Sequence, residues 1–149
     1  MSHTSLTYHI VFSTYKRANV INIAHERELY KYMYDFATKR GIKVFRIGGM
    51  PDHVHLLCEI PAKLAVADFV KLLKSETSKF MRFNPHFPGW QKWAEGYGAF
   101  TVESANRAVR IKYIMNQKAH HGTTTFTEEY RQELTSAGLS IDIILGDEQ

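Results

Sequence analysis

The sequence predicts an α+β domain of the ferredoxin-like or RRM-like kind, a four-stranded antiparallel sheet with helices on one face. The first indication is the order of hydrophobic patterns, which reads strand, helix, strand, strand, helix, strand and then further helices. A second is the alternation of apolar and polar residues over 53–60, and a third is the amphipathic spacing over 66–83. This order leaves the second face of the sheet open.

The first half of the pattern ends in a hairpin. Residues 6–15 are rich in aromatic and β-branched side chains, which favour a strand. A helix is expected from about 24 to 40, where Gly41 ends it. Residues 42–48 alternate as a second strand, and the Gly-Gly-Met-Pro stretch at 48–51 predicts the turn before the third strand.

The second half contains two long helices and one more strand. The amphipathic helix at 66–83 is followed by a Pro- and Gly-rich loop over 84–96. A fourth strand is expected at 97–103 and a helix at about 104–121. A last short helix is expected over 126–138, within a C-terminal helix and tail that span 126–149.

Length and composition favour one cytoplasmic domain over residues 1–149. The chain is 44% hydrophobic, enough to bury a core, and it has no apolar run long enough to cross a membrane. Its N-terminus lacks the features of a signal peptide. The single cysteine, Cys58, excludes a disulfide within the chain and fits a reducing compartment. The formal charge of +4 weakly suggests a polyanionic partner.

Two histidines begin the third strand. Because side chains alternate across a strand, His53 and His55 face away from the apolar side chains that follow each of them. They start about 7 Å apart at the backbone, a separation from which two imidazoles can converge on one metal ion. By themselves the two histidines are equally well explained as surface residues of a sheet.

A polar stripe on the helix at 104–121 supports a site. At 100° per residue, one face carries Asn106, Arg110, Tyr113, Gln117 and His120. The opposite face carries apolar residues, which we expect to pack: Ala108, Ile111, Ile114 and Met115. Tyrosine on the polar face is therefore not positioned to fill a core.

The HVH motif after a hairpin turn, the strand YGAFTVES and the helix YIMNQ followed by KAHH together resemble the single-tyrosine HUH transposases of the insertion sequence 200/605 family. The similarity covers nearly the whole chain. It implies that His53, His55 and Gln117 bind a divalent metal and that Tyr113 attacks DNA, which leaves a covalent 5′-phosphotyrosine. Oxygen from Gln117 and from phosphate suits Mg²⁺ or Mn²⁺, and the two histidines shift the preference toward transition metals. Neutral ligands leave most of the ion's charge for the substrate.

The same resemblance implies partners. It implies single-stranded DNA with subterminal hairpins at the ends of a mobile element, and a homodimer in which the tyrosine helix docks on its own chain or on the partner. We expect Asp52 and Glu59 to orient the imidazoles. Basic residues expected to contact phosphates are Lys16, Arg17, Arg46, Lys71, Lys74, Arg82 and Arg110.

Some aromatic residues and some functions stay open. Trp90 and Trp93 either stack on bases or pack, and packing is favoured for at least one. On the first strand, Tyr8, His9 and Tyr15 are equally ambiguous. The main alternative function is a domesticated relative that binds hairpin nucleic acid without cutting it. A metal-sensing ferredoxin-like domain leaves Tyr113 and Gln117 unexplained, and an RNA binder of the RRM kind requires exposed aromatics on its central strands.

Overall fold

The computed structural model describes residues 1–120 and 125–136, which fall in two compact units, Met1–Gln117 and Lys118–Gln149. Four antiparallel strands form one sheet in the order β2-β3-β1-β4. This arrangement confirms the predicted α+β class, and the two central strands are β1 and β3. The strands are β1 (Thr7–Ser13), β2 (Lys43–Met50), β3 (His53–Glu59) and β4 (Gly98–Thr101). Within the described part of the chain, no helix is long and apolar enough to span a membrane.

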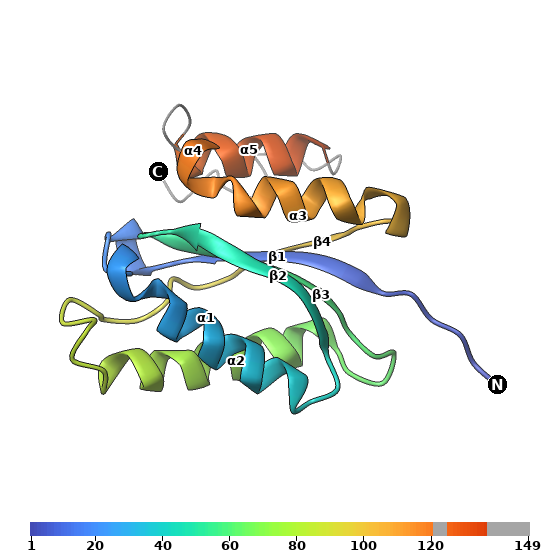
Figure 1. The fold of residues 1–149 in the computed structure, drawn as a ribbon, viewed down its shortest axis with the longest axis horizontal. Coiled ribbons are helices and arrows are strands. Elements are labelled where there is room, and N and C mark those ends of the chain that lie inside the picture. The colour runs from blue at the N-terminus through green and yellow to red at the C-terminus, as the bar shows by residue number, and fades with distance from the viewer. Residues whose placement is uncertain (121–124, 137–149) are drawn as a thin grey trace. The chain divides into compact units, whose positions relative to one another are not determined.

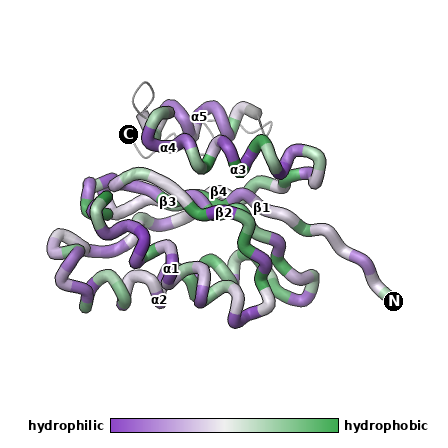
Figure 2. The backbone as a smooth tube through the Cα atoms, viewed as in Figure 1, coloured by the Kyte–Doolittle hydropathy of each residue, from purple (hydrophilic) through white to green (hydrophobic). Residues whose placement is uncertain are grey.

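Helices α1 (Glu26–Thr38) and α2 (Val66–Arg82) cover one face of the sheet (Figure 1). Both helices mix hydrophobic and hydrophilic residues along their length (Figure 2), as a helix does when one side packs and the other meets water. The core between these layers is apolar. Its buried side chains include Ile10, Phe12, Leu29, Met33, Val54, Leu56, Cys58, Phe69 and Leu73.

Both tryptophans pack in this core. Trp93 Nε1 donates to Thr77 Oγ1 at 2.9 Å, and Trp90 Nε1 donates to Ser78 Oγ at 3.2 Å. The preference for packing over base stacking is confirmed, because both rings are buried. Their indole N–H groups find partners on α2, as buried tryptophans normally require.

The hairpin turn is shorter than expected. Strand β2 runs to Met50, so the turn consists of Pro51 and Asp52 alone, and the prediction of a turn over 48–51 is wrong. Gly48 and Gly49 are instead strand residues at points of close approach. A Cβ on Gly49 would overlap the backbone of His53, and one on Gly48 would lie 2.8 Å from both Cγ2 and the carbonyl oxygen of Ile114.

The predicted helix at 104–121 is three elements. A 3₁₀ turn, Ser104–Asn106, leads into α3 (Arg107–Met115), and α4 (Gln117–His120) begins after a break at Asn116. Helix α3 contacts β2 and β3 on the face opposite α1 and α2, so that face is not fully open (Figure 1).

The packed side of α3 also differs from the expectation. Ile114 is buried and Ile111 is partly buried, but Met115 and Ala108 are exposed. Arg110 and Tyr113 of the polar stripe face the sheet, where they contact His9 and His55, whereas Asn106 is exposed.

The second unit contains α5 (Phe126–Ser136), and Phe126 stacks on Tyr130 with ring centroids 5.8 Å apart. Residues 137–138, where the predicted last helix ends, and the tail to 149 lie outside the described residues.

Candidate active site

The two β3 histidines lie on the sheet face that α3 covers. His53 is paired with Ser13 on one side and Met50 on the other, and His55 is paired with Val11 and Gly48. Because β3 is bonded on both edges, the backbone beneath the two rings is held by hydrogen bonds. The ring centroids are 5.0 Å apart, and both side chains are buried.

His53 is held by hydrogen-bonding groups at both nitrogens. Its Nδ1 lies 2.7 Å from Asp52 Oδ1, and its Nε2 lies 3.1 Å from Gln117 Oε1. A carboxylate can only accept, so it selects the tautomer with a proton on Nδ1. In the neutral ring, the Nε2 lone pair then faces the amide oxygen, which is also an acceptor. Two acceptors that face each other across 3.1 Å are suited to share a cation.

His55 is in contact with a third histidine, His9. His9 Nε2 lies 2.7 Å from His55 Nδ1, and the two ring centroids are 4.9 Å apart. His9 is fully buried on β1, where it pairs with Leu57. Arg110 Nη1 reaches the other His9 nitrogen, Nδ1, at 3.4 Å. The sequence left His9 undecided, and the signal that identifies it is the pairing register of β1 and β3, which puts His9 and His55 on one face.

Tyr113 lies beside these rings. Its ring centroid is 5.9 Å from that of His55 and 6.1 Å from that of His9, both in edge-on orientations. The guanidinium of Arg110, one turn earlier on α3, is 5.9 Å from the centre of the tyrosine ring. Helix α3 therefore brings the tyrosine and the arginine to the histidines of its own chain, and Gln117 reaches them from the start of α4.

Of the two residues expected to orient the imidazoles, only one contacts a histidine. Asp52 contacts His53 directly. Glu59 ends β3, four residues beyond His55 and therefore about 13 Å away along the strand. Glu59 is therefore not close to the histidines, because each residue of a strand adds about 3.3 Å of length.

The expected phosphate-binding residues lie on two sides of the sheet. Arg110 is in the site, Arg46 pairs with Leu57 on an exposed stretch of β2, and Lys16 and Arg17 follow the end of β1 that pairs with His53. The three on α2 belong to the opposite layer: Lys71, Lys74 and Arg82.

Lys74 is engaged within the protein. Its Nζ donates to the carbonyl oxygens of Ala94 at 2.7 Å and Gly96 at 2.8 Å, and burial lowers the pKa of the ammonium. This lysine holds the loop after α2, and it is not presented to a ligand near the histidines.

Comparison with known proteins identifies the family. Residues 2–117 match the sequence profile of the family described as "Transposase IS200 like". The chain belongs to this family. It is 32% identical over 117 residues to the ISDra2 transposase TnpA of Deinococcus radiodurans, covering 75% of this chain and 84% of that one. It is also 28% identical over 129 residues to the transposase for insertion sequence element IS200 of Salmonella typhimurium, covering 78% and 81%.

Solved structures agree with this assignment. A crystal structure of a candidate transposase from Deinococcus radiodurans R1 superposes with a TM-score of 0.60 at 32% identity, covering 78% of this chain and 93% of the other. A REP-associated tyrosine transposase bound to a REP hairpin gives the same TM-score at 12% identity, covering 83% and 76%, which shows the shared fold. The predicted family and fold are confirmed: the protein is an IS200-like transposase, an enzyme class that cuts DNA.

Proposed function

We propose that this transposase cuts and rejoins single-stranded DNA through a covalent 5′-phosphotyrosine on Tyr113, at a divalent-cation site made by His53, His55 and Gln117. One observation carries the proposal. Two segments far apart in the sequence, the start of β3 and the start of α4, bring an imidazole nitrogen to 3.1 Å from an amide oxygen, and the tyrosine of α3 lies beside the second imidazole.

The side chains fit a cation by their chemistry. His53 Nε2 and Gln117 Oε1 face each other as acceptors, and the amide nitrogen of Gln117 is buried with no hydrogen-bond partner among the described residues. Asp52 accepts from Nδ1 of His53, which is how the outer partners of metal-binding imidazoles usually act, and His9 Nε2 lies 2.7 Å from Nδ1 of His55. The amide oxygen and the phosphate oxygens of a substrate suit Mg²⁺ or Mn²⁺, and the two imidazoles favour Mn²⁺ over Mg²⁺.

When bound, the cation would polarise the scissile phosphate and stabilise the departing oxygen. The side chains of the protein carry out the bond exchange itself. Tyr113 Oη attacks phosphorus and forms a P–O bond, the bond from phosphorus to the 3′-oxygen breaks, and the phenol proton is released. The 3′-oxygen leaves as a hydroxyl after it takes up a proton. A second 3′-hydroxyl reverses these steps and joins a new strand without ATP.

Arg110 is well placed to assist this step. Its guanidinium lies beside the Tyr113 ring and reaches His9, so its positive charge is near both the nucleophile and the proposed cation ligands. A guanidinium binds phosphate oxygens in pairs and stabilises the phenolate electrostatically. We assign it to orienting the scissile phosphate.

The proposed substrate is single-stranded DNA that carries hairpins at the ends of a mobile element. The similar structure with a bound REP hairpin supports this choice. Lys16, Arg17 and Arg46 border the strands that carry the histidines and are the phosphate contacts that we favour outside Arg110. Lys71, Lys74 and Arg82 remain sequence predictions. Because a transposition joins two ends, we propose that a homodimer supplies two tyrosines.

The test uses single-stranded oligonucleotides that tile both strands of the DNA flanking the gene, with Mn²⁺ and full-length protein. We expect an adduct that survives SDS, which is lost with chelator and in Tyr113→Phe. Tyr34→Phe removes a hydroxyl from an exposed tyrosine on α1 and is the matched control that keeps the adduct. Tight hairpin binding without any adduct would refute cleavage and favour a domesticated binding relative.

A further inference from the structure

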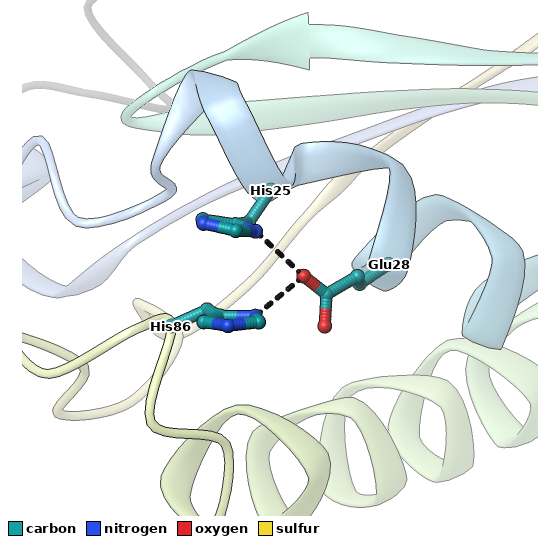
Figure 3. Close-up of side chains that lie close together, drawn as sticks. All are labelled: His25, Glu28 and His86. Carbon is teal, nitrogen blue, oxygen red and sulfur yellow. Dashed lines mark hydrogen bonds and ion pairs between the residues drawn. The ribbon is translucent and has the colours of Figure 1, made fainter.

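A second cluster of potential metal ligands lies away from the catalytic face. His25 ends the 3₁₀ turn that precedes α1, Glu28 is in the first turn of α1, and His86 is in the loop after α2. The two helices pack side by side, which brings His86 to residues 58 or more positions earlier in the chain. Figure 3 shows both imidazoles directed at one carboxylate oxygen of Glu28.

The ligand atoms are close enough to serve one ion. Glu28 Oε2 lies 2.8 Å from His25 Nδ1 and 2.7 Å from His86 Nδ1, and all three atoms are within 4.8 Å of one another. The imidazole rings stack with centroids 3.7 Å apart and an interplanar angle of 13°. An ion bound about 2.1 Å from each atom lies near the plane of each ring that coordinates it, so the two rings must rotate out of their stacked arrangement to bind it. Side-chain exposures of 34%, 38% and 48% for His25, Glu28 and His86 leave room for this movement and for a water ligand.

Neighbouring groups hold the Glu28 carboxylate in an orientation that suits a bound cation. Asn84 Nδ2 donates to the other oxygen of Glu28, Oε1, at 3.1 Å, and so turns Oε2 toward the imidazoles. The Asn84 amide oxygen accepts from the backbone N–H of His86, which fixes the loop that carries this ligand. Hydrogen-bonded carboxylates of this kind are typical of metal sites. Within the described part of the chain, the ion-pair partners of Glu28 are the two histidines and no lysine or arginine.

We propose that His25, Glu28 and His86 form a second divalent-cation site, suited to Zn²⁺ or a similar transition metal, that joins the start of α1 to the loop after α2. Two imidazoles and one carboxylate are a known protein ligand set for zinc, with a fourth position for water. Cation binding would replace two N–H···O hydrogen bonds with three bonds to one ion. The site uses none of the residues assigned to DNA cleavage, so it stands independently of the proposed function.

The test is a Zn²⁺ titration of full-length, metal-stripped protein by calorimetry, repeated with Co²⁺ to follow its visible absorption. We expect two equivalents for the unmodified protein if both sites bind. His86→Ala should remove one equivalent and the increase in Tm that Zn²⁺ produces. His53→Ala should remove the other equivalent and leave the His86 site intact. Asn84→Ala should weaken the second site about 10- to 100-fold.

His3→Ala is the matched control, because His3 is an exposed histidine outside both clusters. If His86→Ala and His3→Ala bind Zn²⁺ with the same stoichiometry and affinity, the second site does not exist and the cluster is held by hydrogen bonds alone. Glu28→Gln also distinguishes a metal site from a cluster held by hydrogen bonds alone, because it keeps a hydrogen-bond acceptor and removes the anionic ligand. A Glu28→Gln protein that still binds two equivalents would also overturn the proposal.

Discussion

The two faces of β3 are equally buried but are stabilised differently. On one face Val54, Leu56 and Cys58 pack between the sheet and the helices α1 and α2. On the other, His53 and His55 are also almost inaccessible to water but are held by hydrogen bonds and by contacts below α3. Burial alone therefore does not separate the core from the site. The comparison teaches that the even positions of one strand can serve packing alone, while the odd positions place two buried histidines beside an apolar residue, Leu57, that packs with Ile114 of α3.

Of the substitutions that test this comparison, Leu56→Ala is expected to have the largest effect, which is on stability. Removing a fully buried leucine side chain leaves a cavity in the core and should lower the free energy of unfolding by about 2 to 5 kcal/mol. Urea unfolding measures the loss. Leu72→Ala, at a leucine on α2 that is 46% exposed, is the control and should change stability much less. Equal losses of stability in the two variants would contradict the assignment of Leu56 to the core.

The substitution His55→Ala, at the adjacent position, should lower DNA cleavage strongly and stability only a little. We expect formation of the DNA adduct to fall about 100-fold or more, because a bound cation contributes several kcal/mol to transition-state stabilisation. The urea midpoint should move less than in Leu56→Ala. Adduct assays and unfolding curves on both variants provide the comparison, and undiminished cleavage by His55→Ala would contradict the proposed ligand set.

His9 offers a finer test of the polar face. His9→Phe keeps a ring at this position but removes the nitrogen that contacts His55 Nδ1. Mn²⁺ affinity, measured by electron paramagnetic resonance, should fall about 10- to 100-fold. His9→Gln restores a side chain that can hydrogen-bond to His55 and should recover part of the affinity. Unchanged Mn²⁺ binding in His9→Phe would show that His9 only fills space.

The smallest effect is expected at Cys58, on the packed face. Burial raises the pKa of its thiol to about 12, so the reactive thiolate is scarce at pH 8. The native protein should react with a disulfide reagent such as DTNB far more slowly than the protein in urea. Rapid labelling of the native protein would show that the apolar face of β3 opens readily.

Much of this organisation could be predicted from local patterns. Alternation along β3 placed His53 and His55 together because the period of a strand is two residues. The spacing of Tyr113 and Gln117 placed both on one side of a helix, and the break at Asn116 did not separate them from the histidines.

The remaining features depend on tertiary contacts. His9 joins the site only through the register between β1 and β3, which no local pattern encodes. The packed side of α3 was predicted only in part. Ile111 and Ile114 pack with Leu57 and Val102 as an apolar face should, but the surface below α3 also carries histidines, which polar residues of the helix contact. Glu59 was assigned to the site by sequence proximity alone, although the strand carries it about 13 Å beyond His55.

Gly48 has a consequence for how the catalytic helix is positioned. With only a hydrogen atom at this point, the helix lies against the sheet one residue after the tyrosine, where any Cβ would meet Ile114. The clearance between the proposed nucleophile and the proposed cation ligands is thus set by a residue with no functional group. Alanine and then valine at this position would act as spacers of increasing thickness. Such a series would adjust the separation of the two halves of the site while leaving every reacting group unchanged.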